Sequence, residues 1–205
     1  MIESFENTFQ IVVLLICTNI AVFRAWKYKS RTWTLLSFFY GCFLLGDIYW
    51  LLYLVFMGQT PQISVVSDLS WYAAIVFLYF LIRHISPPEQ VKSRSLLAWL
   101  SPGFAFVMAL YYMQRGEIVS NLIYAGLMGL LLHASLSRLT DKGQTAPIRM
   151  VAGAVLTLCL LEYALWTASC IWEGDSPLNP YIWIDFLLSI SFLLLIPATQ
   201  KAVET

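Results

Sequence analysis

Apolar residues dominate seven long stretches of the chain, and short polar segments separate these stretches from one another. A helix needs about 20 mainly apolar residues to cross the hydrocarbon core of a bilayer. The pattern therefore predicts an all-α integral membrane protein with seven transmembrane helices in a single domain, 1–205. The predicted helices cover residues 6–24, 33–57, 64–83, 95–113, 118–138, 147–172 and 178–198.

The composition agrees with a membrane protein and narrows the possible partners. Hydrophobic residues make up 60% of the chain and charged residues 12%, whereas a soluble domain carries about 25% charged residues. The formal net charge is zero, so we expect the lipid bilayer and no nucleic acid as a partner. The four cysteines lie in apolar stretches without a CxxC pair. They are predicted to be core residues, and we assign no metal site and no cofactor.

The basic residues predict how the helices are oriented. Of the 12 Lys and Arg residues, all but Arg115 fall within or at the borders of the first, third and fifth predicted loops or in the C-terminal tail. Cytoplasmic loops are enriched in Lys and Arg. The distribution therefore places the N-terminus outside the membrane and the C-terminus in the cytoplasm. An even number of helices would break this alternation, so the charges also favour seven.

Two helix pairs share an ordered set of residues, namely an acid, a glycine, a proline and a second acid. The intervals between these residues match within one position. The two sets are Asp47, Gly58, Pro61 and Asp68, and Glu162, Gly174, Pro177 and Asp185. Both pairs run in the same direction through the membrane, which is typical of a parallel internal repeat. We predict a 3+1+3 layout, with halves of about 1–83 and 118–205 and a linking helix, 95–113.

The four repeated acids lie in the outer half of the predicted bundle. Asp47 and Glu162 each precede the outer end of their helix by about ten residues, or about 15 Å. A charged side chain near the bilayer centre costs roughly 2.5–3.5 kcal/mol, and no Lys or Arg lies at this depth. Such acids must share protons, bind a cation or face water. Aromatic residues in the same layer would add cation–π attraction. The predicted ligand-binding residues are Asp47, Asp68, Glu162, Asp185, Trp50, Trp71, Tyr72 and Trp166.

A structural role for the acids is the alternative. Asp47 or Glu162 could be protonated and hydrogen-bonded to Tyr, Trp or backbone groups, which would hold helices together. Asp68 is close enough to a helix start to act as an N-cap, for which aspartate is well suited. Asp185 is too deep for that role. Arg115 could close over the site as a lid, or it could be an ordinary loop residue.

Part of the first half resembles a known kind of bacterial membrane region. Gly46, Asp47 and Trp50, then a loop with Gly58 and Pro61, then Asp68, Trp71 and Tyr72 carry the resemblance. This arrangement resembles the multi-helix sensory regions that precede diguanylate cyclase (GGDEF) and histidine-kinase domains. The resemblance implies a multi-pass protein of a bacterial plasma membrane and ligand sensing outside or within that membrane. Because no output domain follows here, we expect a separate cytoplasmic signalling protein as a partner.

We therefore expect a sensor or receptor-like protein that binds a small polar or cationic ligand in an outward-facing acidic and aromatic pocket. A small secondary transporter with carboxylate-based proton coupling is the alternative. A third hypothesis is an intramembrane lipid hydrolase, since the pair Gly46 and Asp47 is similar to one in lysoplasmalogenase-like membrane hydrolases. The chain has no HExxH or GxSxG motif, so no catalytic residue is assigned.

Overall fold

The computed structural model describes residues 2–59, 61, 65–91, 95–172, 174 and 176–204. These residues form seven α-helices and one short 3-10 helix, and they contain no strand. The helices are α1 (Ile2–Tyr28), α2 (Arg31–Met57), α3 (Val65–Ile85), η1 (Pro88–Gln90), α4 (Leu96–Tyr112), α5 (Ile118–Thr140), α6 (Ala146–Ile171) and α7 (Pro180–Val203). The all-α prediction is confirmed. Lys92 and Arg94, which belong to the third predicted loop, lie outside the described residues.

Local sequence signals account for several helix ends. Gly58 ends α2 with a φ of 68°, and its N–H bonds to the Leu54 carbonyl. Only glycine adopts this left-handed conformation without strain. Asn179 caps α7, where its side chain accepts a hydrogen bond from the Tyr181 N–H at 3.0 Å. α1 and α7 extend beyond their predicted apolar limits, because helical hydrogen bonding continues past the apolar segment.

Six helices are long and apolar enough to cross a membrane, namely α1, α2, α3, α5, α6 and α7. α4 has 17 residues, which gives a length of about 25 Å and is short for a full crossing. α4 nevertheless has an apolar exposed surface. Its exposed apolar residues include Leu96, Leu97, Trp99, Leu100, Phe104 and Phe106. The chain is therefore a membrane protein whose helices contact lipid.

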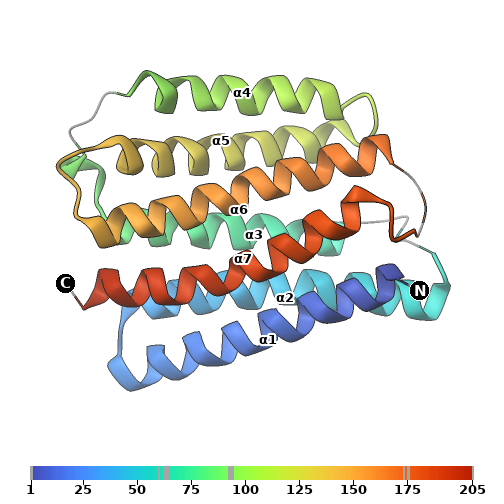
Figure 1. Ribbon diagram of the computed structural model, residues 1–205, viewed down its shortest axis with the longest axis horizontal. Coiled ribbons are helices and arrows are strands. Elements are labelled where there is room, and N and C mark those ends of the chain that lie inside the picture. The colour runs from blue at the N-terminus through green and yellow to red at the C-terminus, as the bar shows by residue number, and fades with distance from the viewer. Residues whose placement is uncertain are drawn as a thin grey trace.

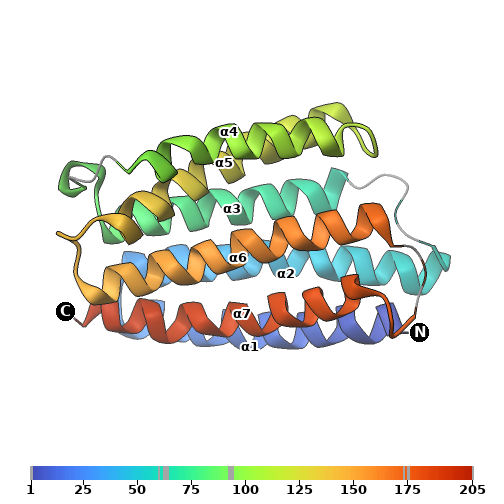
Figure 2. The same ribbon diagram turned by 45° about the horizontal axis from the view of Figure 1, so that its top comes forward.

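All seven helices lie along one long axis, and the two chain ends lie at opposite ends of the bundle (Figures 1 and 2). Six helices pack in the cyclic order α1, α2, α3, α5, α6, α7, and α7 returns to contact α1. α4 packs on the outside, against α5. We call the end that holds Ile2 the N-terminal end; α1, α3, α5 and α7 begin there, and α2, α4 and α6 end there.

Aromatic side chains hold α2 and α7 together at the centre of the ring. The rings of Phe43 and Phe192 meet edge to face, with their centroids 4.8 Å apart. The Tyr40 hydroxyl donates a hydrogen bond to the Phe192 carbonyl at 2.7 Å. Within a bilayer, moving an apolar side chain from lipid into a helix contact gains little free energy, because acyl chains are equally apolar. Helices are therefore held together by close packing and buried hydrogen bonds. This central seam fixes α2 against α7 and so places the acids of both helices within one bundle.

Candidate functional site

Asp47 lies on α2 and is 2% exposed. The Trp71 indole N–H from α3 donates a hydrogen bond to its Oδ1 at 2.9 Å. The Trp71 ring lies 6.4 Å from the Phe43 ring and 5.8 Å from the Trp50 ring, measured between centroids. The other carboxyl oxygen, Oδ2, is buried and has no hydrogen-bond partner among the described residues. Two of the predicted aromatic residues therefore surround Asp47, and only one of them bonds to it.

Gly46 explains how Trp71 comes so close to α2. A Cβ atom at position 46 would lie 2.6 Å from the Trp71 Nε1 atom, which is closer than real Cβ atoms approach. The missing side chain leaves the indole room to lie across the helix and reach the next residue, Asp47. The Gly-Asp pair of the sequence is thus a single structural unit with Trp71.

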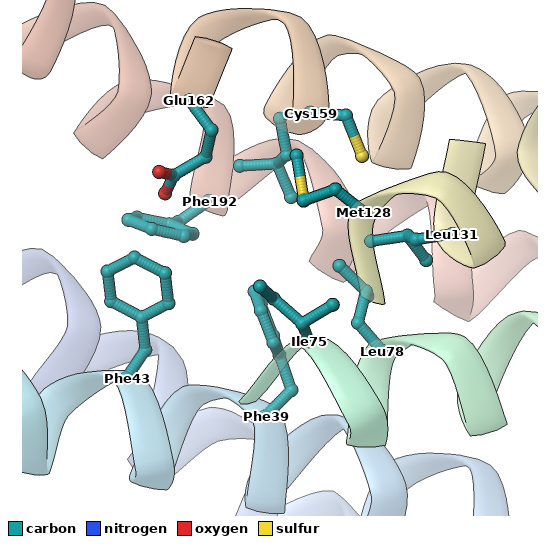
Figure 3. Close-up of a pocket in the computed structure, with 10 residues that line it drawn as sticks. Phe39, Phe43, Ile75, Leu78, Met128, Leu131, Cys159, Glu162 and Phe192 are labelled. Carbon is teal, nitrogen blue, oxygen red and sulfur yellow. The ribbon is translucent and has the colours of Figure 1, made fainter. Parts of the chain in front are cut away.

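Glu162 lies on α6, partly buried, and accepts a hydrogen bond from the Tyr124 hydroxyl at 3.4 Å. Trp166, one turn further along, packs against Tyr124 with ring centroids 5.7 Å apart. Figure 3 shows the Glu162 carboxylate directed into the bundle, beside Phe192 and above Phe43. It is the polar group on a cavity of about 20 Å³ with otherwise apolar walls. A space of that size accommodates about one water molecule.

Asp185 lies on α7 and is 3% exposed. The Gln10 side-chain amide from α1 donates a hydrogen bond to its Oδ1 at 3.3 Å. Asp185 is the sixth residue of a helix that Asn179 caps, so the expectation that it is too deep to be an N-cap is confirmed. Its contact joins the last helix of the bundle to the first.

Glu6 is a buried acid that the sequence analysis missed. It lies on α1, one turn before Gln10 and on the same face, and is 1% exposed. Neither of its carboxyl oxygens has a hydrogen-bond partner among the described residues. The buried positions of α1 include Glu6, Gln10, Val13, Leu14, Cys17 and Ala21. Their spacing of three and four residues could have identified Glu6 as part of the inward face.

Asp68 belongs to a different contact. The Ser120 hydroxyl from α5 donates a hydrogen bond to Asp68 Oδ2 at 3.0 Å, and the Tyr72 hydroxyl bonds to Ser120. α3 begins at Val65, so Asp68 lies within its first turn, and the N-cap alternative is wrong. Asp68 and Tyr72 thus join α3 to α5, whereas Trp71, the neighbour of Tyr72, bonds to Asp47 on α2.

Asp47 and Glu162 face each other across the bundle. Their carboxyl groups are close enough to interact electrostatically, and Tyr181 of α7 lies within the same range of both. The hydrogen-bond donors described above for Asp47, Glu162 and Asp185 are neutral, namely an indole, a phenol and an amide. A carboxylate with neutral partners in an apolar environment is stable when it takes up a proton or a cation.

Other residue types that bind ligands do not gather in the described part of the chain. No three His, Cys, Asp or Glu side chains there are arranged to hold a metal ion. The four cysteines are free thiols. Cys17 and Cys159 are buried, as predicted for core residues, whereas Cys42 and Cys170 are only partly buried. Arg115 is exposed in the turn between α4 and α5.

Comparisons with protein-family models, curated proteins and solved structures found no match for this chain.

Proposed function

We propose that the protein is a membrane sensor that binds a small cation between the facing acids Asp47 and Glu162. The observation that carries this proposal is that Oδ2 of Asp47 is buried without a hydrogen-bond donor among the described residues, while Glu162 lies close enough to interact with it. Buried polar groups are normally hydrogen-bonded, so each exception calls for an explanation. A bound cation or proton supplies the missing positive charge.

The size of the space favours a small ligand. The cavity beside Glu162 has about 20 Å³, enough for one water molecule or a bare ion. The rings of Phe43 and Phe192 flank it, and aromatic faces attract cations. The proposal therefore narrows the expected ligand to an inorganic ion or a small ammonium group.

Two observations support the internal repeat. Gly58 and Gly174, which occupy equivalent positions, both have a positive φ, of 68° and 96°. Asp68 on α3 bonds to Ser120 on α5, and Asp185 on α7 bonds to Gln10 on α1. In each case the third helix of one half binds the first helix of the other half. The cyclic packing order with α4 outside is that of a 3+1+3 layout.

The predicted topology indicates on which side of the membrane the proposed site lies. α4 runs from the C-terminal end of the bundle to the N-terminal end (Figure 1), which supports seven crossings rather than six. With basic loops in the cytoplasm, the N-terminal end faces outward, and the acids lie below the outer surface of a plasma membrane. The resemblance to bacterial sensory regions adds the expectation that ligand binding is signalled to the cytoplasmic side.

Cation-dependent thermal stability tests this proposal. The purified protein is titrated at constant pH and ionic strength with Na⁺, Ca²⁺ and methylammonium, with the bulky cation N-methylglucamine as the replacement. A ligand at 100 times its Kd stabilises the folded state by about 2.7 kcal/mol, so at least one cation should raise the Tm by several degrees. Asp47→Asn and Glu162→Gln should lose this response.

The control is Glu117→Gln, since Glu117 is an exposed acid at the same end of the bundle. It should respond to the cation as the native protein does. Asp47→Asn and Glu162→Gln variants that keep a full response would refute the proposed site, and so would a native protein that responds to none of the cations.

The repeat-like pairing also supports a second candidate, a small secondary transporter. Transporters built from repeats place their sites at the interface between the repeats, and Asp47 and Glu162 come from opposite halves. Cation uptake into vesicles, driven by a pH gradient and abolished in Asp47→Asn, would favour transport. Binding without uptake would favour the sensor.

A further inference from the structure

A second and larger cavity lies at the C-terminal end of the bundle, away from the acids. It has a volume of about 250 Å³ and lies between the end of α3, η1, the start of α4 and the end of α5. Aromatic and basic side chains line it, including Tyr79, Arg83, Trp99, His133 and Arg138. No Asp or Glu among the described residues contributes to its walls. The cavity is therefore positively charged.

Arg138 is a buried cation whose hydrogen bonds go to backbone carbonyl groups. It is 3% exposed. Its Nε and Nη2 atoms donate to the Ser86 carbonyl, and Nη1 donates to the Ala134 carbonyl at 2.8 Å. Three bonds use three of the five N–H donors of a guanidinium group. Carbonyl oxygens carry only partial charge, so these bonds orient the guanidinium without neutralising it.

A second cation, Arg83, lies beside Arg138 and adds donor capacity. Arg83 donates a hydrogen bond to the Tyr79 hydroxyl at 2.7 Å, and its charge is close enough to interact with that of Arg138. Two cations held near each other repel unless an anion lies between them. His133 lies on the same wall, where its Nδ1–H donates to the Ala98 carbonyl at 2.8 Å, because a carbonyl can only accept.

We propose that this cavity binds the phosphate group of an anionic membrane lipid. Arginine pairs bind phosphate oxygens through charge-assisted hydrogen bonds. Arg83 lies in the last turn of α3 and Arg138 in the last turn of α5. Side chains at helix ends lie at the level of the lipid headgroups. Basic pockets between transmembrane helices on the cytoplasmic side bind anionic headgroups, and the positive-inside rule assigns this end to the cytoplasm.

The walls of the cavity favour a lipid over a soluble phosphate compound. Trp99 on α4 and Leu130 on α5 line the cavity and are 67% and 52% exposed. Both lie on helices that contact lipid, so acyl chains can lie along them while the phosphate is held by the arginines. A site for a soluble anion would gain nothing from apolar side chains at its rim.

Lipid titration of the purified protein in neutral detergent tests the proposal. The probes are short-chain phosphatidylglycerol, short-chain phosphatidylcholine and inorganic phosphate, each followed by thermal shift and by native mass spectrometry. Phosphatidylglycerol should raise the Tm in a saturable way, and the other two probes should have little effect. Arg83→Gln should weaken the binding of phosphatidylglycerol about tenfold, since it removes one charge-assisted hydrogen bond.

Arg83→Gln is the decisive variant, because Arg138→Gln would also remove bonds that join α5 to Ser86. Lys142→Gln is its control, since Lys142 is an exposed cation at the same end that does not line the cavity. Equal binding of phosphatidylglycerol by Arg83→Gln and Lys142→Gln would overturn the site. If phosphatidylcholine raised the Tm as much as phosphatidylglycerol, the proposed role of the net charge of the lipid would be wrong. If inorganic phosphate raised the Tm as much, the proposal that the ligand is a lipid would be wrong.

Discussion

At the scale of single residues, the contact between Gly46, Asp47 and Trp71 depends on the absence of one carbon atom. The indole N–H reaches Asp47 at 2.9 Å because nothing projects from Gly46. Trp71 in turn packs between Phe43 and Trp50. A small change at position 46 should therefore disturb both a buried hydrogen bond and an aromatic cluster.

Gly46→Ala should destabilise the protein. The added Cβ would displace the Trp71 indole, which costs about 1–3 kcal/mol for the lost bond to a buried acceptor. Thermal unfolding in detergent, with tryptophan fluorescence as a second readout, measures the effect. Gly41→Ala is the control on the same helix, because a Cβ there meets no atom within 4 Å. It should leave the protein as stable as before or slightly more stable. An equal effect of the two substitutions would contradict the assigned role of Gly46.

Two adjacent side chains of α3 also contact different helices. Trp71 and Tyr72 are adjacent in the chain, and successive residues of a helix point about 100° apart. Trp71 therefore reaches Asp47 on α2, whereas Tyr72 reaches Ser120 on α5. The two aromatic residues, which the sequence analysis placed together with Asp68, serve two different helix contacts.

At the scale of helices, α4 differs from the other six. It packs against α5 outside the ring, and Gly129 of α5 allows the close approach. A Cβ at Gly129 would lie 3.4 Å from both Pro102 and Ala105 of α4. Small residues at helix contacts let backbones approach closely within a membrane. This contact holds the element that links the two proposed repeats.

Gly129→Leu should detach α4 from α5 and lower stability by about 1–3 kcal/mol through overpacking. Gly126→Leu is the control one turn earlier, since Gly126 is exposed and a Cβ there meets nothing within 4 Å. Limited proteolysis of the segments on either side of α4 detects its release, and thermal unfolding measures the loss of stability. Similar behaviour of the two variants would show that α4 does not depend on this contact.

At the scale of the whole molecule, the bundle has two chemically different ends. Buried acids lie nearer the N-terminal end, and a basic cavity lies at the C-terminal end. The aromatic seam of α2 and α7 separates them. This polarity is the basis for placing ligand sensing on one side of the membrane and lipid binding on the other.

Cysteine labelling tests the proposed orientation. Arg115 and Lys142 are exposed in turns at opposite ends of the bundle, so Arg115→Cys and Lys142→Cys report on the two sides. Both variants are made in a protein in which Cys42 and Cys170, the less buried native thiols, have been replaced. A membrane-impermeant maleimide added to intact cells should label Arg115→Cys, and it should label Lys142→Cys only after the membrane is opened. The reverse pattern would invert the topology, and labelling of both from outside would contradict an odd number of crossings between the two ends.

The sequence by itself determined the all-helical membrane character and the positions of the helices. These depend on local properties, since apolar length sets each span and residues such as Gly58 and Asn179 set its ends. It also identified Asp47, Glu162 and Asp185 as acids within apolar segments. Tertiary structure decided which donor each acid meets, because helix rotation and neighbour choice depend on the packing of the whole bundle. It therefore placed Asp68 at the contact between α3 and α5 and buried Glu6.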